Sequence, residues 1–208
     1  DVGVDTVELG VALGVAMEEG LIQFGDGRAV EQVIQGIAKG EMFGRILASG
    51  AVVTGKTFGI ERIPAVKGQG VPAHEPRAVK GMGVTFSVTP MGADHTTGIT
   101  FREQVDHHRP EGQLMASLRV QIKHTVFDTL GLCYFVGTAV GGNPMLTLDL
   151  INAVYGTDLR ENFMNELGKE VLKTERAFNE AAGLIKAHDR VPDFFRYEKL
   201  PPHNLTFD

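Results

Sequence analysis

The apolar residues of this chain recur mostly at the spacing of an α-helix and seldom at that of a β-strand. The clearest case is the segment 113–128, whose apolar residues fall four positions apart: Leu114, Leu118, Ile122 and Val126. Such a series places all its members on one face of a helix. The best strand candidate, 84–88, lies within a segment that we assign to a helix. The sequence therefore predicts a mostly α fold.

Other segments with helical periodicity or helix-boundary residues cover much of the remaining chain. Gly20 and Gly50 are placed to end helices, as glycine often does. Asp158, with Glu161 three residues later, predicts the start of the longest helix. The segment 90–112 is expected to be loop, and the aromatic, proline-rich C-terminal tail to be extended. The expected helices, besides 113–128, are 5–19, 28–39, 42–49, 76–89, 145–155 and 158–187.

The segment 51–73 contains several glycines together with Pro64 and Pro72. We interpret it as irregular loop and as the boundary between two lobes, because such composition is common where domains join. The expected architecture is helical, irregular and two-lobed, with long glycine-rich loops. The first domain is predicted to cover 1–65 and the second 66–208.

Composition restricts the function. A formal net charge of -6 argues against a surface that binds nucleic acid or an anionic membrane. No apolar run reaches the roughly 18–20 residues that span a bilayer. One cysteine in 208 residues fits a reducing compartment, so we expect a cytoplasmic protein. The chain enters an apolar helical pattern almost at once and has no initiator methionine, which predicts a fragment of a longer protein.

The single cysteine, Cys133, ends the sequence Asp-Thr-Leu-Gly-Leu-Cys that follows the helix 113–128. Gly131 would let the chain turn there, and the carboxylate of Asp128 could accept hydrogen bonds. A thiolate suits iron–sulfur or other soft metal coordination. The alternative is that Cys133 packs into the core, as free cysteines commonly do. Residue types alone favour the core alternative.

A second candidate is the loop 91–98, in which His95 follows Asp94 between glycines. A histidine there could give or take a proton near neutral pH. The alternative is a surface histidine held by local hydrogen bonds. The pair His107-His108 is interpreted as solvated loop. The remaining histidines form no pattern in the sequence: His74, His124, His188 and His203.

Taken together, these segments resemble the C-terminal, helical part of the tungsten- or molybdenum-containing aldehyde ferredoxin oxidoreductases. Residues 128–133 are similar to that family's D-x-x-G-L-C turn, and residues 3–5 to the end of its companion D-x-x-G-L-D turn. The stretches 44–50, 75–95 and 175–192 are similar to further family motifs and occur in the same order. The resemblance thus spans nearly the whole chain.

The resemblance implies oxidation of a small aldehyde to its carboxylic acid, with ferredoxin as electron acceptor. It implies a tungsten or molybdenum centre held by two pterins, with a 4Fe–4S cluster nearby. His95 would lie near the metal and transfer a proton. The resemblance assigns the other residues as follows: Cys133 to the cluster, Asp128, Gly131 and Leu132 to one pterin, and Gly3, Val4 and Asp5 to the other.

The chain also departs from the family pattern. The N-terminal domain that cradles the pterins and the C-x-x-C-x-x-x-C group are absent from it. We therefore expect the fragment to bind no cofactor, to be inactive alone, and to have that domain as its partner. Val4 replaces a leucine, and 180–183 lacks the family's common R-E-G. A relative acting on another redox substrate, such as an aromatic acyl-CoA, and a non-catalytic helical interaction module remain alternatives, and homo-oligomer formation is left open.

Overall fold

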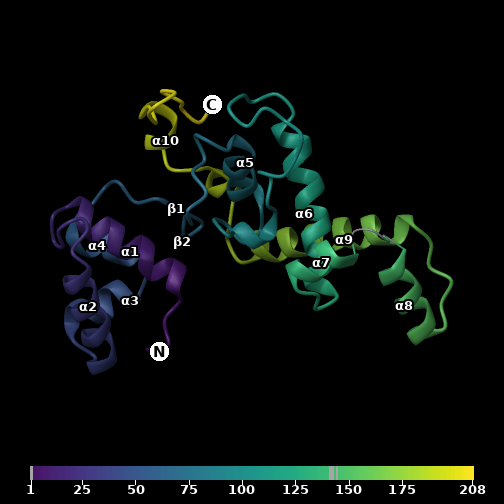
Figure 1. Ribbon diagram of the computed structural model, residues 1–208, viewed down its shortest axis with the longest axis horizontal. Helices are drawn as coiled ribbons and strands as arrows, with labels where there is room; N and C mark the ends of the chain where they lie inside the picture. The colour runs from purple at the N-terminus through teal and green to yellow at the C-terminus, as the bar shows by residue number, and fades with distance from the viewer. Residues whose placement is uncertain (1, 141–142, 144) are drawn as a thin grey trace.

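The computed structural model describes residues 2–140, 143 and 145–208, and it is built almost entirely from helices arranged in two lobes (Figure 1). The sheet structure of the described residues is one antiparallel hairpin, in which β1 (Ala65–Val66) pairs with β2 (Gln69–Gly70). The predicted mostly α class is therefore confirmed. None of the described helices is both long and apolar enough to cross a membrane.

The first lobe packs helices α1 to α4 around two clusters of buried aliphatic side chains. Asp26 accepts hydrogen bonds from the backbone N–H groups of Arg28 and Ala29 and so caps α2, and Gly40, with a φ of 73°, ends it. The predicted limits of α1, α2 and α3 are confirmed to within one residue. The helices are α1 (Thr6–Glu18), α2 (Gly27–Lys39), α3 (Met42–Ala48) and α4 (Ala51–Phe58).

Helix α4 corrects the prediction that 51–73 is irregular loop. Gly55 contributed to the loop prediction, but in the structure this glycine allows close packing inside a helix. A Cβ at Gly55 would lie 2.3 Å from Cδ1 of Ile63, so only glycine lets the returning chain pass this close. The loop prediction is thus wrong for α4 and for the β1–β2 hairpin. The proposed boundary between 65 and 66 stays a prediction.

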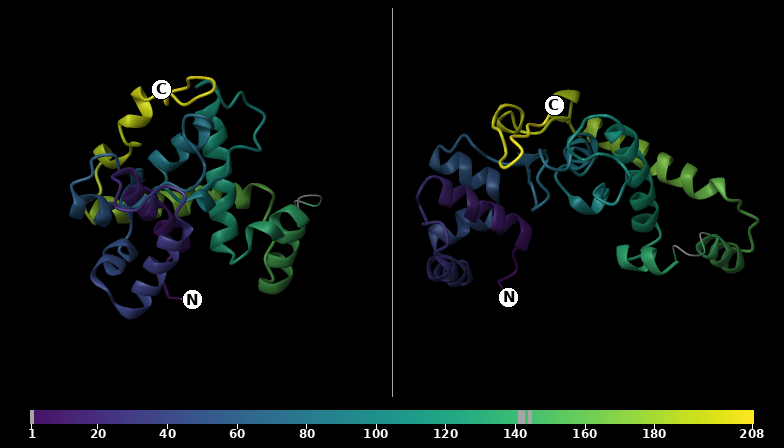
Figure 2. Two further views of the ribbon diagram at one scale, coloured as in Figure 1. Left: turned by 60° about the vertical axis from the view of Figure 1, so that its left-hand side comes forward. Right: turned by 45° about the horizontal axis from the view of Figure 1, so that its top comes forward.

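The second lobe is organised by α6, which packs against α5 and against α9. Helix α8 lies at the end of this lobe farther from the first lobe (Figures 1 and 2). The α-helices are α5 (Lys80–Val88), α6 (Gln113–Thr129), α7 (Tyr134–Val140), α8 (Leu146–Tyr155), α9 (Asn162–Ala181) and α10 (Phe194–Tyr197). Two 3₁₀ turns, η1 (His95–Thr97) and η2 (Lys186–His188), complete the lobe.

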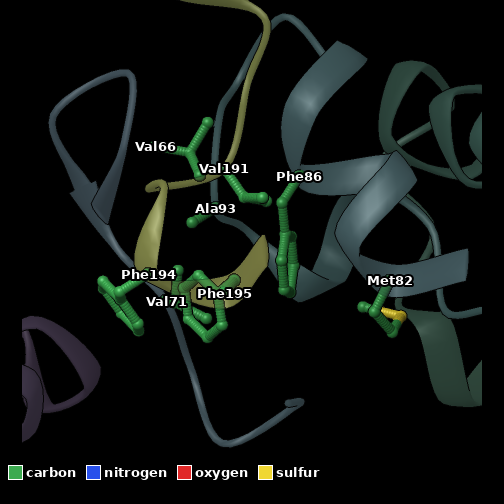
Figure 3. Close-up of a cluster of buried hydrophobic side chains, with 8 residues drawn as sticks. All are labelled: Val66, Val71, Met82, Phe86, Ala93, Val191, Phe194 and Phe195. Atoms are coloured by element: carbon green, nitrogen blue, oxygen red, sulfur yellow. The ribbon is translucent and has the colours of Figure 1, made fainter. Parts of the chain in front are cut away.

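The core of the second lobe joins α5 to the C-terminal segment, as Figure 3 shows. Phe86 lies between Met82, also on α5, and the buried rings of Phe194 and Phe195. Phe207 packs so closely on α5 that a Cβ at Gly83 would lie 2.3 Å from its ring. The C-terminal tail is therefore folded onto the lobe, and the prediction that it is extended is wrong.

Two predicted helix limits in this lobe also need correction. Helix α5 begins at Lys80, whereas the prediction placed its start at residue 76. Helix α9 runs over Asn162–Ala181, shorter than predicted at both ends, so Asp158 is not its N-cap. The spacing of Leu114, Leu118, Ile122 and Val126 correctly predicted helix α6, although Leu114 is 65% and Leu118 43% exposed. The buried face of α6 is largely polar, because its side chains find hydrogen-bond partners: Gln113, Ser117, Gln121 and His124.

Two side chains connect the lobes. The carboxylate of Glu8 on α1 accepts hydrogen bonds from the N–H groups of Ala51 (2.8 Å) and Gly70 (2.7 Å). Glu8 thus caps the start of α4 and also holds the β1–β2 hairpin against α1. Arg62 bonds Glu198 at 2.8 Å and lies 4.3 Å above the ring of Phe194. Both contacts hold the C-terminal segment and the hairpin beside the first lobe.

Candidate functional site

The sequence that contains Cys133 forms a closed turn at the end of α6. The N–H of Gly131 donates to the carbonyl of Asp128 (3.0 Å), and that of Leu132 donates to the carbonyl of Phe127 (2.8 Å). This pair of bonds is the Schellman motif, which requires a left-handed residue, and Gly131 supplies it with a φ of 67°. The turn thus follows from a local glycine signal.

The turn presents Cys133 to the outside of the described chain. Cys133 is a free, exposed cysteine, and the next residue but one, Phe135, is 73% exposed. The alternative in which Cys133 is an ordinary core residue is therefore wrong for this structure. An exposed thiol at a rigid turn is available to a metal or to an approaching segment.

His95 opens the 3₁₀ turn η1, and Asp94 fixes the backbone of that turn. The Asp94 carboxylate accepts bonds from the N–H and the hydroxyl of Thr96, both at 2.7 Å. The same Oδ1 lies 3.9 Å from Nδ1 of His95. The side chain of His95 is 37% exposed, so it can reach both solvent and a ligand.

His74 packs against His95 and was missed by sequence reasoning. The two rings are 5.2 Å apart, and the other neighbour of His74 is Phe101, at 5.6 Å. Burial lowers the pKa of His74, and the nearby His95 lowers it further. His74 is therefore held in its neutral form near pH 7. No spacing rule joins residues 74 and 95, so only the fold could show this contact.

His124 brings the loop of His95 and the turn of Cys133 together. Its buried ring lies on α6, with Nδ1 2.7 Å from the carbonyl oxygen of Thr96. The ring of Tyr134, the residue after Cys133, is 5.0 Å away. Burial lowers the pKa of His124. The two separate candidates of the sequence are thus parts of one region.

A pocket of about 220 Å³ opens beside this junction and carries two carboxyl groups. Burial raises the pKa of Asp128, and the charge of Asp94 adds to the rise. Burial also raises the pKa of Glu175 on α9, with a contribution from Asp128. Carboxyls of this kind hold protons more readily than exposed ones. The lining residues are Thr89, Met91, Thr97, Thr125, Asp128, Thr129, Leu172 and Glu175.

The third predicted site lies elsewhere. Gly3, with a φ of 72°, leads into α1, and Asp5 caps that helix by accepting a bond from the N–H of Glu8 at 2.7 Å. Val4 packs against the core of the first lobe. This turn belongs to the first lobe, and Cys133 belongs to the second (Figures 1 and 2). The structure therefore brings His95 and the Cys133 turn together, and places the Gly3–Asp5 turn apart from them.

Comparison with known proteins identifies the family. Residues 1–206 match the sequence model of aldehyde ferredoxin oxidoreductase, domains 2 and 3. This chain belongs to the aldehyde ferredoxin oxidoreductase family. The tungsten-containing aldehyde ferredoxin oxidoreductases of Pyrococcus horikoshii, Pyrococcus abyssi and Pyrococcus furiosus are 29%, 28% and 27% identical to it. These alignments cover 96–97% of this chain but only 37% of each relative.

The Cys133 turn leaves space for a bound group. The sulfur is exposed, and a Cβ at Gly131 would meet nothing within 4 Å, so a bulky group can approach the backbone there. In the described part of the chain, no three His, Cys, Asp or Glu side chains are grouped to hold a metal. Among the described residues, the turn thus offers one exposed thiol and not a complete set of metal ligands.

Proposed function

We propose that this chain forms part of an enzyme that oxidises an aldehyde to its carboxylic acid and passes the electrons to ferredoxin. The observation that carries the proposal is the exposed Cys133, held on a rigid turn beside the His95 loop in a member of this family. A cytoplasmic location, supported by the single cysteine, belongs to the same proposal.

The residues of the Cys133 turn would bind cofactors. Cys133 would supply the fourth thiolate of a 4Fe–4S cluster, the ligand type that such clusters require. Asp128, Gly131 and Leu132 would contact one pterin. The pKa of Asp128 is raised, so its carboxyl can donate a hydrogen bond to a pterin nitrogen over a wider pH range than an exposed aspartate could.

The turn of Gly3, Val4 and Asp5 would hold the second pterin. Gly3 supports this role because a Cβ there would meet nothing within 4 Å in the chain. Asp5 is exposed beyond its cap, whereas Val4 packs inward and would position the turn. Since this turn lies in the other lobe, the two pterins would approach the chain from separate surfaces.

His95 would transfer a proton. Oxidation of an aldehyde with water yields the acid, two electrons and two protons, and a bound tungsten or molybdenum centre with its pterins would accept the electrons. The side chain of His95 is accessible, with Asp94 and His74 as its neighbours, so its imidazole can be reached by a substrate or a water molecule. Asp128 and Glu175 could then pass protons toward solvent.

The test is made on the full-length protein that contains this chain. We expect tungsten or molybdenum, iron, and aldehyde-dependent reduction of a viologen dye or of ferredoxin. Cys133→Ala should remove the 4Fe–4S signal in electron paramagnetic resonance, whereas His95→Gln should keep that signal and lose most activity. Reduction of an aromatic acyl-CoA without aldehyde oxidation would favour the related substrate class.

The isolated 208-residue chain gives a second test. Because one cysteine cannot hold a cluster alone, we expect it to contain neither metal nor cluster and to be inactive. Stoichiometric tungsten with aldehyde oxidation in this chain would overturn that part of the proposal. A full-length protein free of metal and iron would instead favour a non-catalytic helical module.

A further inference from the structure

His124 is the buried polar side chain at the contact between the two candidate sites. Only 5% of it is exposed, and it lies on the face of α6 that is turned toward η1. Its bond to Thr96 crosses from α6 to the residue after His95. Its ring contact with Tyr134 crosses to the residue after Cys133. The imidazole of His124 therefore contacts Thr96, which follows His95, and Tyr134, which follows Cys133.

The direction of the hydrogen bond follows from its partner. The carbonyl of Thr96 can only accept, so Nδ1 of His124 carries the hydrogen. Burial lowers the pKa of His124, so the ring is neutral near pH 7 and its single N–H proton resides on Nδ1. Leaving a buried N–H without a hydrogen-bond partner costs free energy. The bond therefore favours the position of the turn in which the Thr96 carbonyl lies beside His124.

We propose that His124 is a positioning residue, which fixes the His95–Thr97 turn on α6 by its Nδ1–H bond and fixes Tyr134, beside Cys133, by its ring. The inference rests on the proposed function, because it matters for catalysis only if His95 transfers a proton. Its physical basis is the geometry of catalysis: a proton-transfer group must lie within hydrogen-bond reach of its target, and small displacements are costly.

Neighbouring contacts show why the loop depends on this bond. Within η1 the bonds are local: Asp94 binds Thr96, and Thr97 donates to the carbonyl of Asp94 at 2.7 Å. These bonds shape the turn but do not attach it to another element. In the described residues, the hydrogen bond that joins η1 to another helix is the one between His124 on α6 and the carbonyl of Thr96. Without it, the turn can keep its shape and still shift relative to the Cys133 turn.

Two substitutions separate the two contacts of the ring. His124→Phe keeps an aromatic ring against Tyr134 and removes the donor to Thr96. His124→Asn keeps an N–H donor near the position of Nδ1 and removes the ring. The matched control is His203→Phe, the same change at an exposed histidine outside the site.

Hydrogen–deuterium exchange of the full-length protein measures the attachment of the loop directly. In His124→Phe we expect amide exchange over 95–98 to become about tenfold faster, since one lost hydrogen bond typically permits local opening on that scale. Exchange in α1 to α4 should stay unchanged. His124→Asn should restore most of the protection, and His203→Phe should leave the loop unchanged.

Aldehyde kinetics give the functional result. A displaced His95 impairs the chemical step more than binding, so His124→Phe should lower kcat about tenfold or more while KM stays within about twofold. His124→Asn should recover most of kcat. A general loss of folding would lower the active fraction in both variants and would not be rescued by asparagine.

Two results would overturn the positioning role. One is unchanged exchange over 95–98 in His124→Phe. The other is an increase of equal size in α1 to α4, which would make His124 a general stabilising residue. A wild-type protein that does not oxidise aldehydes would overturn the proposed function instead, and the exchange measurement would still decide whether His124 holds the loop.

Discussion

Asp128 and Glu175 line the same pocket from two different helices. Burial raises the pKa of Glu175, and the charge of Asp128 raises it further. Glu175 begins the stretch 175–192, which is similar to one of the family's motifs. The next residue, Arg176, has a clear structural role, since it binds Asp189 at 2.7 Å and the carbonyl of Val88 at 2.6 Å. In the described part of the chain, no ion pair or hydrogen bond is found for the Glu175 carboxyl, which suits a functional carboxyl better than a structural one.

Glu175→Gln should stabilise the chain. The folded pKa of Glu175 is raised above its usual value of 4.5, so its contribution to stability is present at low pH and lost as pH rises through the folded pKa. At pH 7 the variant should gain ~0.3–1 kcal/mol in free energy of unfolding, a small value because solvent screens this partly exposed group. Urea unfolding at pH 7 and pH 4 measures the gain, which should nearly vanish at pH 4.

The control for this change is Glu180→Gln, on the exposed end of the same helix, which should alter stability little. Equal gains in both variants would mean that the net charge of -6, rather than the Asp128 contact, is responsible. A loss of stability in Glu175→Gln would show that the glutamate makes a favourable contact, against our interpretation.

The ion pair of Lys67 and Asp189 should be the most sensitive electrostatic contact of the second lobe. Lys67 Nζ lies 2.7 Å from Asp189, and its side chain is only 5% exposed. Asp189→Asn leaves this buried ammonium without a counter-charge, which typically costs about 3 kcal/mol. Thermal or urea unfolding measures the loss. Asp193→Asn, which breaks the exposed pair with Arg190, should cost less than about 1 kcal/mol.

The same pair predicts an acid transition. Burial of Asp189 opposes its ionisation, but the hydrogen bonds from Lys67 and Arg176 outweigh burial and lower its pKa. A lowered folded pKa gives stability that is present above the usual value of 3.8 and lost as pH falls through the folded pKa. The difference between wild type and Asp189→Asn should therefore shrink only below about pH 4. A difference that already disappears at pH 6 would exclude this explanation.

The contact of His74 with His95 can be tested by titration. The pKa of His74 is lowered first by burial and then by His95. His95→Gln removes the second contribution, so the pKa of His74 should rise while staying below 6.5, because burial remains. Nuclear magnetic resonance of the histidine ring protons measures it, with His203→Gln as the control. An unchanged His74 pKa in His95→Gln would mean that the ring contact carries no electrostatic coupling.

Sequence periodicity predicted the helices whose signals are local. Asp26 and Gly40 mark the ends of α2, and both act there as caps. The prediction failed for α4, because Gly55 is a packing residue against Ile63 and not a turn residue. Periodicity predicted helix α6 but did not indicate which face is buried, and there Leu114 is exposed while polar side chains are buried. Those positions depend on partners distant in sequence, which periodicity does not contain.

The candidate site shows the same division. The turn at Gly131 was predictable, since a glycine after a long helix is a local signal. The exposure of Cys133 was not, because residue types alone favoured a core position for it. The contacts of His74, His124 and Glu175 join segments about 20 to 50 residues apart and leave no trace in spacing. The assignment of cofactor roles to these residues stays a prediction.

Gly131→Ala and Gly10→Ala should change stability in opposite directions, although a Cβ meets nothing within 4 Å at either site. Gly131 has a φ of 67°, so alanine there is strained and should cost about 1 kcal/mol. Gly10 lies inside α1, where alanine should instead stabilise by about 0.5–1 kcal/mol. Urea unfolding of both variants measures the contrast. Two losses of equal size would show that tertiary contacts, not the left-handed turn, decide the cost. The expected contrast would instead establish that the backbone at Gly131 must be left-handed to present Cys133 where it does.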